Sequence, residues 1–236
     1  MTSQSPSIIY RNQLLGALSA DDLALLTPLL TPVDLALRAE LERPNRPIKN
    51  VFFPEAGMVS VVANGARKKQ LEVGIIGREG MTGLMVVLGN DRSPYSTYIQ
   101  IAGSGQRMTS DDLRSAMQRS PTLAGILFRY VQAFMIQTTQ TAISNGSAKL
   151  EERLARWLLM AHDRVDGDEL PLIHDFLALM LGVRRPGVTV AINSLEQQGL
   201  IRANRGIITV LDREGLKEVA NDSYGVPEAE YKRRMQ

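Results

Sequence analysis

The chain has 236 residues, of which 44% are hydrophobic and 22% are charged, and its formal net charge is +2. This length allows two domains that each bury a core, and the composition is typical of an ordinary globular protein. The chain has no cysteine, which excludes disulfides, thiolate metal sites, iron–sulfur clusters and cysteine nucleophiles.

The first part of the chain predicts short helices followed by a β-rich region. Residues 10–30 show two helical segments, the second capped by Ser19 ahead of two aspartates. Residues 31–108 then change to short strand-like runs, with a polar hairpin turn at Asn64-Gly65. Short strands at near-regular spacing with Gly and Pro turns favour a small β-barrel or sandwich. The runs cover residues 31–37, 51–53, 59–62, 71–76 and 98–101.

Residues 109–145 predict a long helix that Pro121 interrupts, with Thr109 or Ser110 as its cap. Apolar and small polar residues recur every three or four positions along it, which suits the seam of a two-stranded dimer. The alternative is that this stripe packs on the β-rich region, and both can hold on different faces. We assign the dimer seam to Leu123, Leu127, Tyr130, Phe134, Thr138 and Thr141.

Asn145-Gly146-Ser147 predicts a break in this helix, which we take as a hinge between domains 1–145 and 146–236. Ser147 is the expected cap of the next helix. That helix has an apolar face, and we expect its arginines, Arg153 and Arg156, to lie on the outer face together with Arg164.

Residues 172–211 show the spacing of a winged helix-turn-helix, whose second helix enters the DNA major groove. Gly182 can adopt the positive φ that ends a first helix. A second helix follows, with Pro186 tolerated in its first turn and one apolar stripe that begins at Val188. Two short strands joined by residues 202–206 form the wing. The alternative is a helical hairpin that only packs.

The positive charge of the chain gathers in this segment. Residues 181–211 hold four arginines and one acidic residue, Glu196. A phosphate backbone that lies along this segment would meet that charge. The arginines are Arg184, Arg185, Arg202 and Arg205.

The order of these parts resembles the Crp/Fnr superfamily of bacterial transcription regulators, related to the cyclic-AMP receptor protein. The resemblance lies in residues 152–158, 176–185, 195–201 and 205–208 and in the overall architecture. It implies an α+β fold: an N-terminal β-roll (a double-stranded β-helix like that of cyclic-nucleotide-binding domains), a long dimerisation helix and a C-terminal winged helix-turn-helix. It also implies a homodimer, a palindromic site on double-stranded DNA, contact with RNA polymerase and control by a small effector.

The resemblance places Arg185 at the family's base-reading arginine, suited to a bidentate contact with guanine. Pro186 and Val190 stand where the family commonly has other base-reading residues, and neither side chain donates a hydrogen bond. Thr189 and Asn193 are then the further readers, and Val188 or Val190 the contacts to thymine methyl groups. We assign phosphate contacts to Arg184, Arg202, Arg205 and His174.

The expected effector pocket departs from the family pattern. Where cyclic-nucleotide binders carry a glutamate that holds the ribose, this chain reads Met81-Thr82-Gly83-Leu84. An unmatched ribose hydroxyl costs about 1–3 kcal/mol, so we expect an effector other than cyclic AMP and assign no certain cofactor. The candidate pocket residues are Glu72, Thr82, Gly83, Leu84, Arg92 and Ser93.

Two other classes of function are weighed against a DNA-binding regulator. A signalling module whose winged helix binds protein does not account for the arginines of the wing and second helix. An enzyme would need His162-Asp163 or His174-Asp175, but neighbours on a helix point about 100° apart, and no metal-ligand spacing is present. We therefore expect no catalysis. With no secretory signal and no apolar run of the roughly 20 residues that span a bilayer, we expect a cytoplasmic protein without membrane contact.

Overall fold

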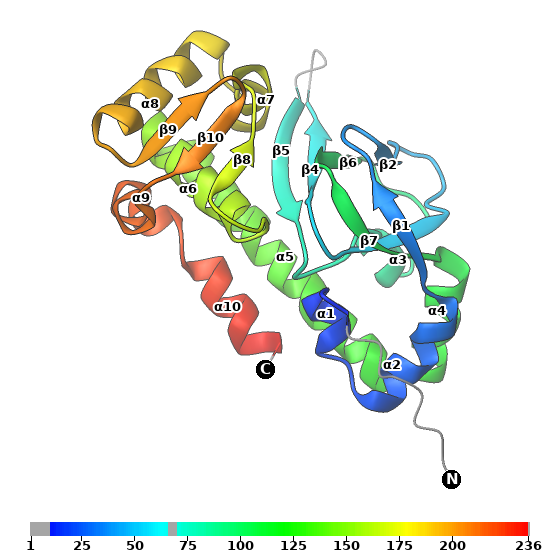
Figure 1. The fold of residues 1–236 in the computed structure, drawn as a ribbon. Helices are drawn as coiled ribbons and strands as arrows, with labels where there is room; N and C mark the ends of the chain where they lie inside the picture. The colour runs from blue at the N-terminus through cyan, green and yellow to red at the C-terminus, as the bar shows by residue number, and fades with distance from the viewer. Residues whose placement is uncertain (1–9, 66–69, 236) are drawn as a thin grey trace.

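The computed structural model describes residues 10–65 and 70–235 (Figure 1). The N-terminal helices are α1 (Gln13–Gly16) and α2 (Ala20–Leu26), followed by a 3-10 turn, η1 (Thr27–Leu29). Ser19 caps α2 by accepting the Asp22 N–H at 3.1 Å, as predicted. Residues 66–69, next to the predicted turn at Asn64-Gly65, lie outside the described residues.

The β-rich region is a roll of two antiparallel sheets. One sheet has the order β1-β7-β3 and the other the order β2-β6-β4-β5. The strands are β1 (Thr31–Leu35), β2 (Glu40–Glu42), β3 (Asn50–Pro54), β4 (Met58–Asn64), β5 (Gln70–Ile76), β6 (Ser96–Ile101) and β7 (Gly103–Thr109), with the short helix α3 (Leu84–Val87) between β5 and β6. The prediction missed β2 and β7; β7 pairs with both β1 and β3.

Strand β4 is buried on both of its faces. Val59 and Val61 point into the roll, where they pack with Ile99. Met58 and Val62 point to the opposite face and belong to a core shared with the C-terminal domain. Successive side chains of a strand alternate between faces, so the nearly continuous apolar run of β4 reflects two separate cores.

The long helical stretch forms two helices that meet at Pro121, as the sequence predicts. Helix α4 (Ser110–Arg119) is capped by Thr109, and α5 (Pro121–Ser147) begins with Pro121 after the cap Ser120. The proline therefore restarts the helix, as expected. The break predicted at Asn145-Gly146-Ser147 is wrong, because α5 continues to Ser147, whose hydroxyl donates to the Ile143 carbonyl.

The C-terminal domain follows a two-residue break at Ala148 and Lys149, which separates α5 from α6 (Leu150–His162). Lys149, not Ser147, is the N-cap of α6, and its N–H donates to the Glu152 carboxylate at 3.3 Å. The remaining elements are β8 (Glu169–Pro171), α7 (His174–Leu181), α8 (Arg185–Gln197), β9 (Ile201–Asn204), β10 (Ile207–Val210), α9 (Arg213–Ala220), η3 (Asn221–Ser223) and α10 (Val226–Met235).

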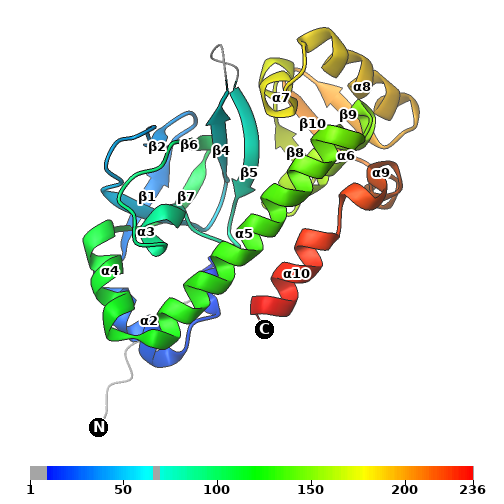
Figure 2. The same ribbon diagram turned by 180° about the vertical axis from the view of Figure 1, so that it is seen from behind.

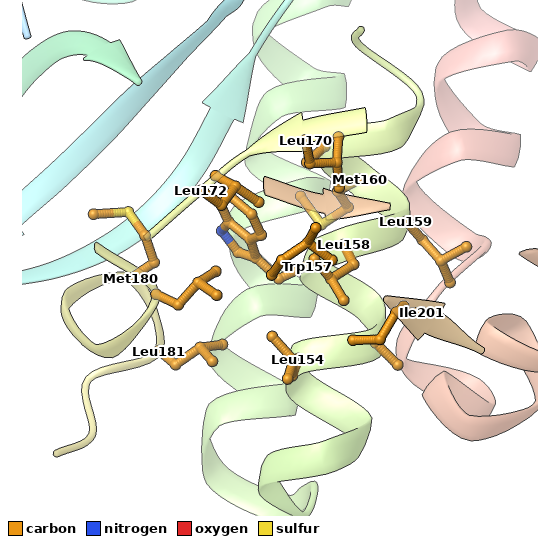
Figure 3. Packing of buried hydrophobic residues seen from close by; sticks show 14 of the residues in the cluster. Leu154, Trp157, Leu158, Leu159, Met160, Leu170, Leu172, Met180, Leu181 and Ile201 are labelled. Atoms are coloured by element: carbon orange, nitrogen blue, oxygen red, sulfur yellow. The ribbon is translucent and has the colours of Figure 1, made fainter. Parts of the chain in front are cut away.

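Helix α6 is the centre of the C-terminal core. Trp157, Leu158 and their neighbours pack among side chains from β8, α7 and β9 (Figure 3). The prediction that the arginines lie on the outer face is wrong for Arg156 and Arg164, which are buried, while Arg153 is half-buried. Arg156 bonds to the Ser223 carbonyl and the Thr141 hydroxyl, and Arg164 pairs with Glu79 at 2.7 Å.

Helix α10, which the sequence analysis did not predict, returns to the N-terminal domain. It lies along α5 on the side away from the β-roll (Figure 2). The Tyr231 hydroxyl donates to the Glu79 carbonyl at 2.6 Å, and Arg234 donates to Gln132 at 3.0 Å. The last helix of the chain therefore joins the C-terminal domain to α5 and to the β-roll.

Candidate nucleic-acid interface and sensor pocket

Helices α7 and α8 form the predicted helix-turn-helix. Gly182 ends α7 with a φ of 64°, and the Val183 N–H bonds to the Ala178 carbonyl at 3.0 Å, which closes the turn. Arg184 is the N-cap of α8, so Pro186 lies in its first turn, where a missing N–H has no cost. Val188, Ala191 and Leu195 are buried against the rest of the domain.

The opposite face of α8 is largely exposed to solvent. Arg184, Arg185 and Asn193 are exposed and Thr189 is half-buried, as the sequence predicts. Val188 is fully buried, so its assignment as a base contact is wrong; the apolar stripe requires it for the core. Val190 is 64% exposed and is the apolar residue that this face presents.

The wing is a three-stranded sheet of order β8-β10-β9, with one strand more than predicted. Its turn contains only Arg205 and Gly206, which have φ angles of 47° and 82°. A two-residue turn with both φ values positive matches the twist of a hairpin. Arg202 therefore lies in β9 and not in the turn, while Arg205 is at the tip; both are exposed.

Helix α8 and the wing are held together across a cleft. The Glu196 carboxylate accepts the Ala203 N–H at 2.7 Å, which fixes α8 to β9. The cleft has a volume of about 280 Å³, and His174, Asn193 and Arg205 line it. These three residues, which were predicted as DNA contacts from separate segments of the sequence, therefore lie on one surface.

The α5 stripe predicted as a dimer seam is instead part of this chain's own core. Leu123, Leu127, Tyr130 and Phe134 are buried, and the Tyr130 hydroxyl donates to the Met81 carbonyl at 3.1 Å. Thr138 lines the β-roll pocket described below, and Thr141 accepts from Arg156. These residues pack on the β-roll and on the C-terminal domain, which was the alternative interpretation.

A second stripe on α5 is exposed to solvent except at Gly125, which is half-buried. Its residues are spaced alternately three and four positions apart, which is the heptad pattern of a coiled coil. Phe128 is 46% exposed, Met135 is 60% exposed and the neighbouring Ile143 is 54% exposed. The stripe consists of Gly125, Phe128, Gln132, Met135, Thr139 and Ala142.

The β-roll contains a pocket of about 320 Å³ against α5. Leu84 and Ser93 line it, as predicted. Thr82 and Gly83 do not: the Thr82 hydroxyl accepts the Phe52 N–H, and the Gly83 N–H donates to Glu42. Arg92 is also outside the pocket, because its exposed guanidinium bonds to the Asn45 carbonyl at 3.3 Å.

Among the residues that the structure describes, Glu42 and Tyr95 are the ionisable side chains that line this pocket, and the sequence did not indicate Glu42. Burial raises the pKa of Glu42, while hydrogen bonds from Gly83 and Thr97 lower it. Most of the remaining wall is apolar and includes Phe134 and Met135 of α5. Strand β2 has a register shift between Glu40 and Glu42, so a regular alternation of side chains along the strand does not predict that Glu42 faces inward.

Glu72, also predicted in the pocket, lies on the opposite face of its sheet. Its carboxylate accepts from the Trp157 indole N–H at 2.5 Å and from the Ser60 hydroxyl. Burial raises its pKa to about 7, although these hydrogen bonds and the charges of Arg156 and Arg164 favour the ionised form. Glu72 therefore joins the β-roll to α6.

The two histidines have structural contacts. His162 lies within 2.9 Å of Asp168 and 2.8 Å of Arg213, and His174 contacts Thr189. Among residues 10–65 and 70–235, no group of three or more His, Asp and Glu side chains is arranged to hold a metal ion. No helix of these ranges is long and apolar enough to cross a membrane.

The C-terminal domain matches a known family. Residues 152–219 match the model of the Crp-like helix-turn-helix domain. The C-terminal domain therefore carries a Crp-like helix-turn-helix. The whole chain has the fold of solved Crp/Fnr family regulators, with the β-roll, long helix and winged helix in the expected order.

A curated relative shares part of the sequence, and solved structures share the fold. The transcriptional regulator SdrP of Thermus thermophilus is 38% identical over 81 residues, which are 32% of this chain and 40% of that protein's length. FixK2 of Bradyrhizobium japonicum has a TM-score of 0.70 at 16% identity, covering 81% of this chain and 98% of that one. A Crp/Fnr family regulator from Eubacterium rectale has a TM-score of 0.68 at 16% identity, covering 88% of this chain and 97% of that one.

Proposed function

We propose that this Crp/Fnr-type chain is a transcription regulator that binds a palindromic DNA site as a homodimer. The observation that carries the proposal is the exposed polar face of α8, next to the arginines of the wing. Such a face fits the major groove, while Arg202 and Arg205 of the wing neutralise phosphates. A regulator of this kind acts on the chromosome, in the cytoplasm of a bacterium.

The direct test is a gel-shift titration with DNA selected from a random pool. We expect selective binding to palindromic sites whose half-sites are about one helical turn, ~34 Å, apart. Equal affinity for selected and scrambled duplexes at physiological salt would contradict the proposal. The resemblance also implies contact with RNA polymerase, which stays a prediction.

Arg185→Ala is expected to weaken binding to the selected site by about 1–3 kcal/mol and to relax the preference at one base pair, because a bidentate contact to guanine is lost. Arg184→Ala is the matched control. As a phosphate contact, Arg184 should affect all sequences about equally and reduce the salt dependence by about one phosphate. Equal losses on matched and scrambled DNA for Arg185→Ala would remove its role as a base reader.

The exposed stripe of α5 supports the dimer part of this proposal. Apolar Phe128 and Met135 stand exposed in coiled-coil register on this face, and Gln132 between them accepts a hydrogen bond from Arg234 of α10. Pairing this stripe with the same stripe of a second copy buries these side chains. The two-residue break at Ala148 and Lys149 is then the hinge and the domain boundary, two residues after the predicted one.

The pocket against α5 supports control by a small effector other than cyclic AMP. Among residues 10–65 and 70–235, no arginine or lysine lines it, so these residues offer a buried cyclic phosphate no cation. An occupant would touch Phe134 and Met135, and Met135 belongs to the exposed stripe. An effector at this position can therefore shift the α5 helices against each other and change the spacing of the recognition helices.

Thermal-shift screening tests the effector. Cyclic AMP is expected to leave the melting temperature unchanged, whereas a ligand at 100 times its Kd stabilises by about 2.7 kcal/mol. A ligand found by the screen should lose its shift in Glu42→Gln if it donates a hydrogen bond or carries a positive charge. A saturable shift with cyclic AMP would contradict this part of the proposal.

A further inference from the structure

Two adjacent residues at the start of α7 contact the recognition helix. The Asp175 Oδ1 lies 3.5 Å from the Arg185 Nε, and the His174 Nδ1 lies 3.2 Å from the Thr189 Oγ1. Arg185 and Thr189 are four residues apart, so they occupy one face of α8. Two of the residues that we expect to read bases on this face, Arg185 and Thr189, are therefore held by residues of α7.

The contact with Asp175 leaves the reading end of Arg185 free. The carboxylate lies at Nε, on the side of the guanidinium, and this is the ion pair that Arg185 forms within the described part of the chain. Both terminal nitrogens of the guanidinium stay available for the O6 and N7 atoms of guanine. Asp175 thus favours an end-on approach to the base.

The hydrogen bonds of Thr189 determine the role of His174. The Thr189 hydroxyl donates to the Arg185 carbonyl at 3.3 Å. Its oxygen therefore accepts the Nδ1 hydrogen of His174, an assignment that follows from the hydrogen-bond network. This arrangement leaves the His174 Nε2 as an acceptor at the cleft between α8 and the wing, which His174 lines.

We propose that His174 and Asp175 are positioning residues that set the base specificity of α8 without reading bases themselves. This inference rests on the proposed DNA binding. Asp175 keeps Arg185 from turning to the nearest phosphate, because its carboxylate holds the guanidinium and repels the DNA backbone. Removing the Arg185 guanidinium from water is then favourable only where a guanine offers it two acceptors. Binding to other sequences is weaker for this reason.

Asp175 also lies in the first turn of α7, where any acidic side chain stabilises a helix. Asp111 provides the matched control, since it is exposed, lies in the first turn of α4 and pairs with a nearby arginine, Arg114, at 2.5 Å. Asp175→Asn and Asp111→Asn remove the same charge at equivalent helix positions. A purely structural role would lower the melting temperature in both and change the DNA preference in neither.

The experiment measures affinity for two duplexes, one selected by the wild-type protein from random DNA and one scrambled, at several salt concentrations. The Asp175→Asn protein is expected to bind the scrambled duplex about tenfold more tightly than the wild type. Its affinity should also fall more steeply with salt concentration, by the slope of about one additional phosphate contact. Binding to the selected duplex should change much less, so that the ratio of the two affinities falls. In an Arg185→Ala background the same substitution should leave the ratio unchanged.

An unchanged ratio for Asp175→Asn, in a protein whose wild type is selective, would overturn the role of Asp175 and leave DNA binding intact. A wild type without selectivity would instead overturn the proposed function, so the two failures are distinguishable. His174→Ala should weaken discrimination at the base pair that Thr189 contacts, whereas discrimination at the Arg185 base pair should persist. Equal effects at both base pairs would contradict the separate role of His174.

Discussion

Met135→Glu is expected to make the protein monomeric and to abolish tight binding to palindromic DNA. Met135 is at the centre of the exposed α5 stripe, with Phe128 two turns before it. In a dimer across this stripe, two glutamates would face each other in an apolar seam, which combines like-charge repulsion with burial of unpaired charge. The two half-sites would then be bound independently.

The expected loss of affinity is large because a dimer binds both half-sites at once. Binding two sites through one dimer raises the overall affinity by about 10²–10⁴ over one site alone, so the affinity for the palindrome should fall by at least about a hundredfold. Sedimentation and gel-shift titration measure the two effects. Leu37→Glu is the control, because Leu37 is 55% exposed and belongs to the β-roll surface rather than to α5. A Met135→Glu protein that stays dimeric would contradict the seam.

Glu72→Gln is expected to stabilise the protein at neutral and higher pH. Glu72 is buried between β5 and α6, where burial raises its pKa to about 7, and hydrogen bonds from Ser60 and Trp157 offset only part of this cost. In the unfolded chain a glutamate has a pKa of about 4.3. Between these values the folded protein keeps the proton and the unfolded chain has lost it.

The difference between the two pKa values of Glu72 determines how stability changes with pH. The folded state binds more protons in this window, so the contribution of Glu72 to the free energy of unfolding falls as the pH rises from about 4.3 to about 7 and is constant above that range. The total is about 4 kcal/mol, since one pKa unit corresponds to about 1.4 kcal/mol and the two pKa values, about 7 and about 4.3, differ by nearly three. Denaturant midpoints measured from pH 5 to 8 should show the stability of Glu72→Gln rising relative to the wild type by most of this amount.

A matched control isolates this effect from the other titrating groups. Glu214 is exposed and pairs with Lys217 on the surface of α9, so Glu214→Gln removes the same carboxylate charge without changing a buried site. The free energy of unfolding of Glu214→Gln should differ little from that of the wild type between pH 5 and 8. If the difference in free energy of unfolding between Glu72→Gln and the wild type does not vary with pH, Glu72 is ionised in the folded protein.

The sequence determined the parts of this protein that depend on local patterns. The turn at Gly182, the apolar stripe of α8 and the proline in its first turn follow from residues a few positions apart, and the structure has all three. The exposure of Arg185, Asn193 and Arg205 could be predicted because the other side of each element is needed for the core. Periodicity alone carries this information.

The tertiary structure decided which of two possible surfaces each element uses. Helix α5 has apolar residues on both sides, so its sequence could not show that Leu127 and Phe134 pack on the β-roll while Phe128 and Met135 face solvent. Strand β7 begins Gly103-Ser104-Gly105 and shows no apolar alternation, yet it pairs with β1 and β3. Its pairing depends on backbone groups that every sequence has.

Contacts between distant segments account for the remaining differences. Glu72 was placed in the effector pocket, but β5 directs it to the other face of the sheet, where Trp157 meets it from 85 residues away in the sequence. Asp175 and Arg185 are ten residues apart and come together only because the turn at Gly182 folds α8 back across α7. A sequence pattern predicts which face of an element is apolar, whereas the partner of that face, and therefore the burial and charge of each side chain on it, is determined by the packing of the whole chain.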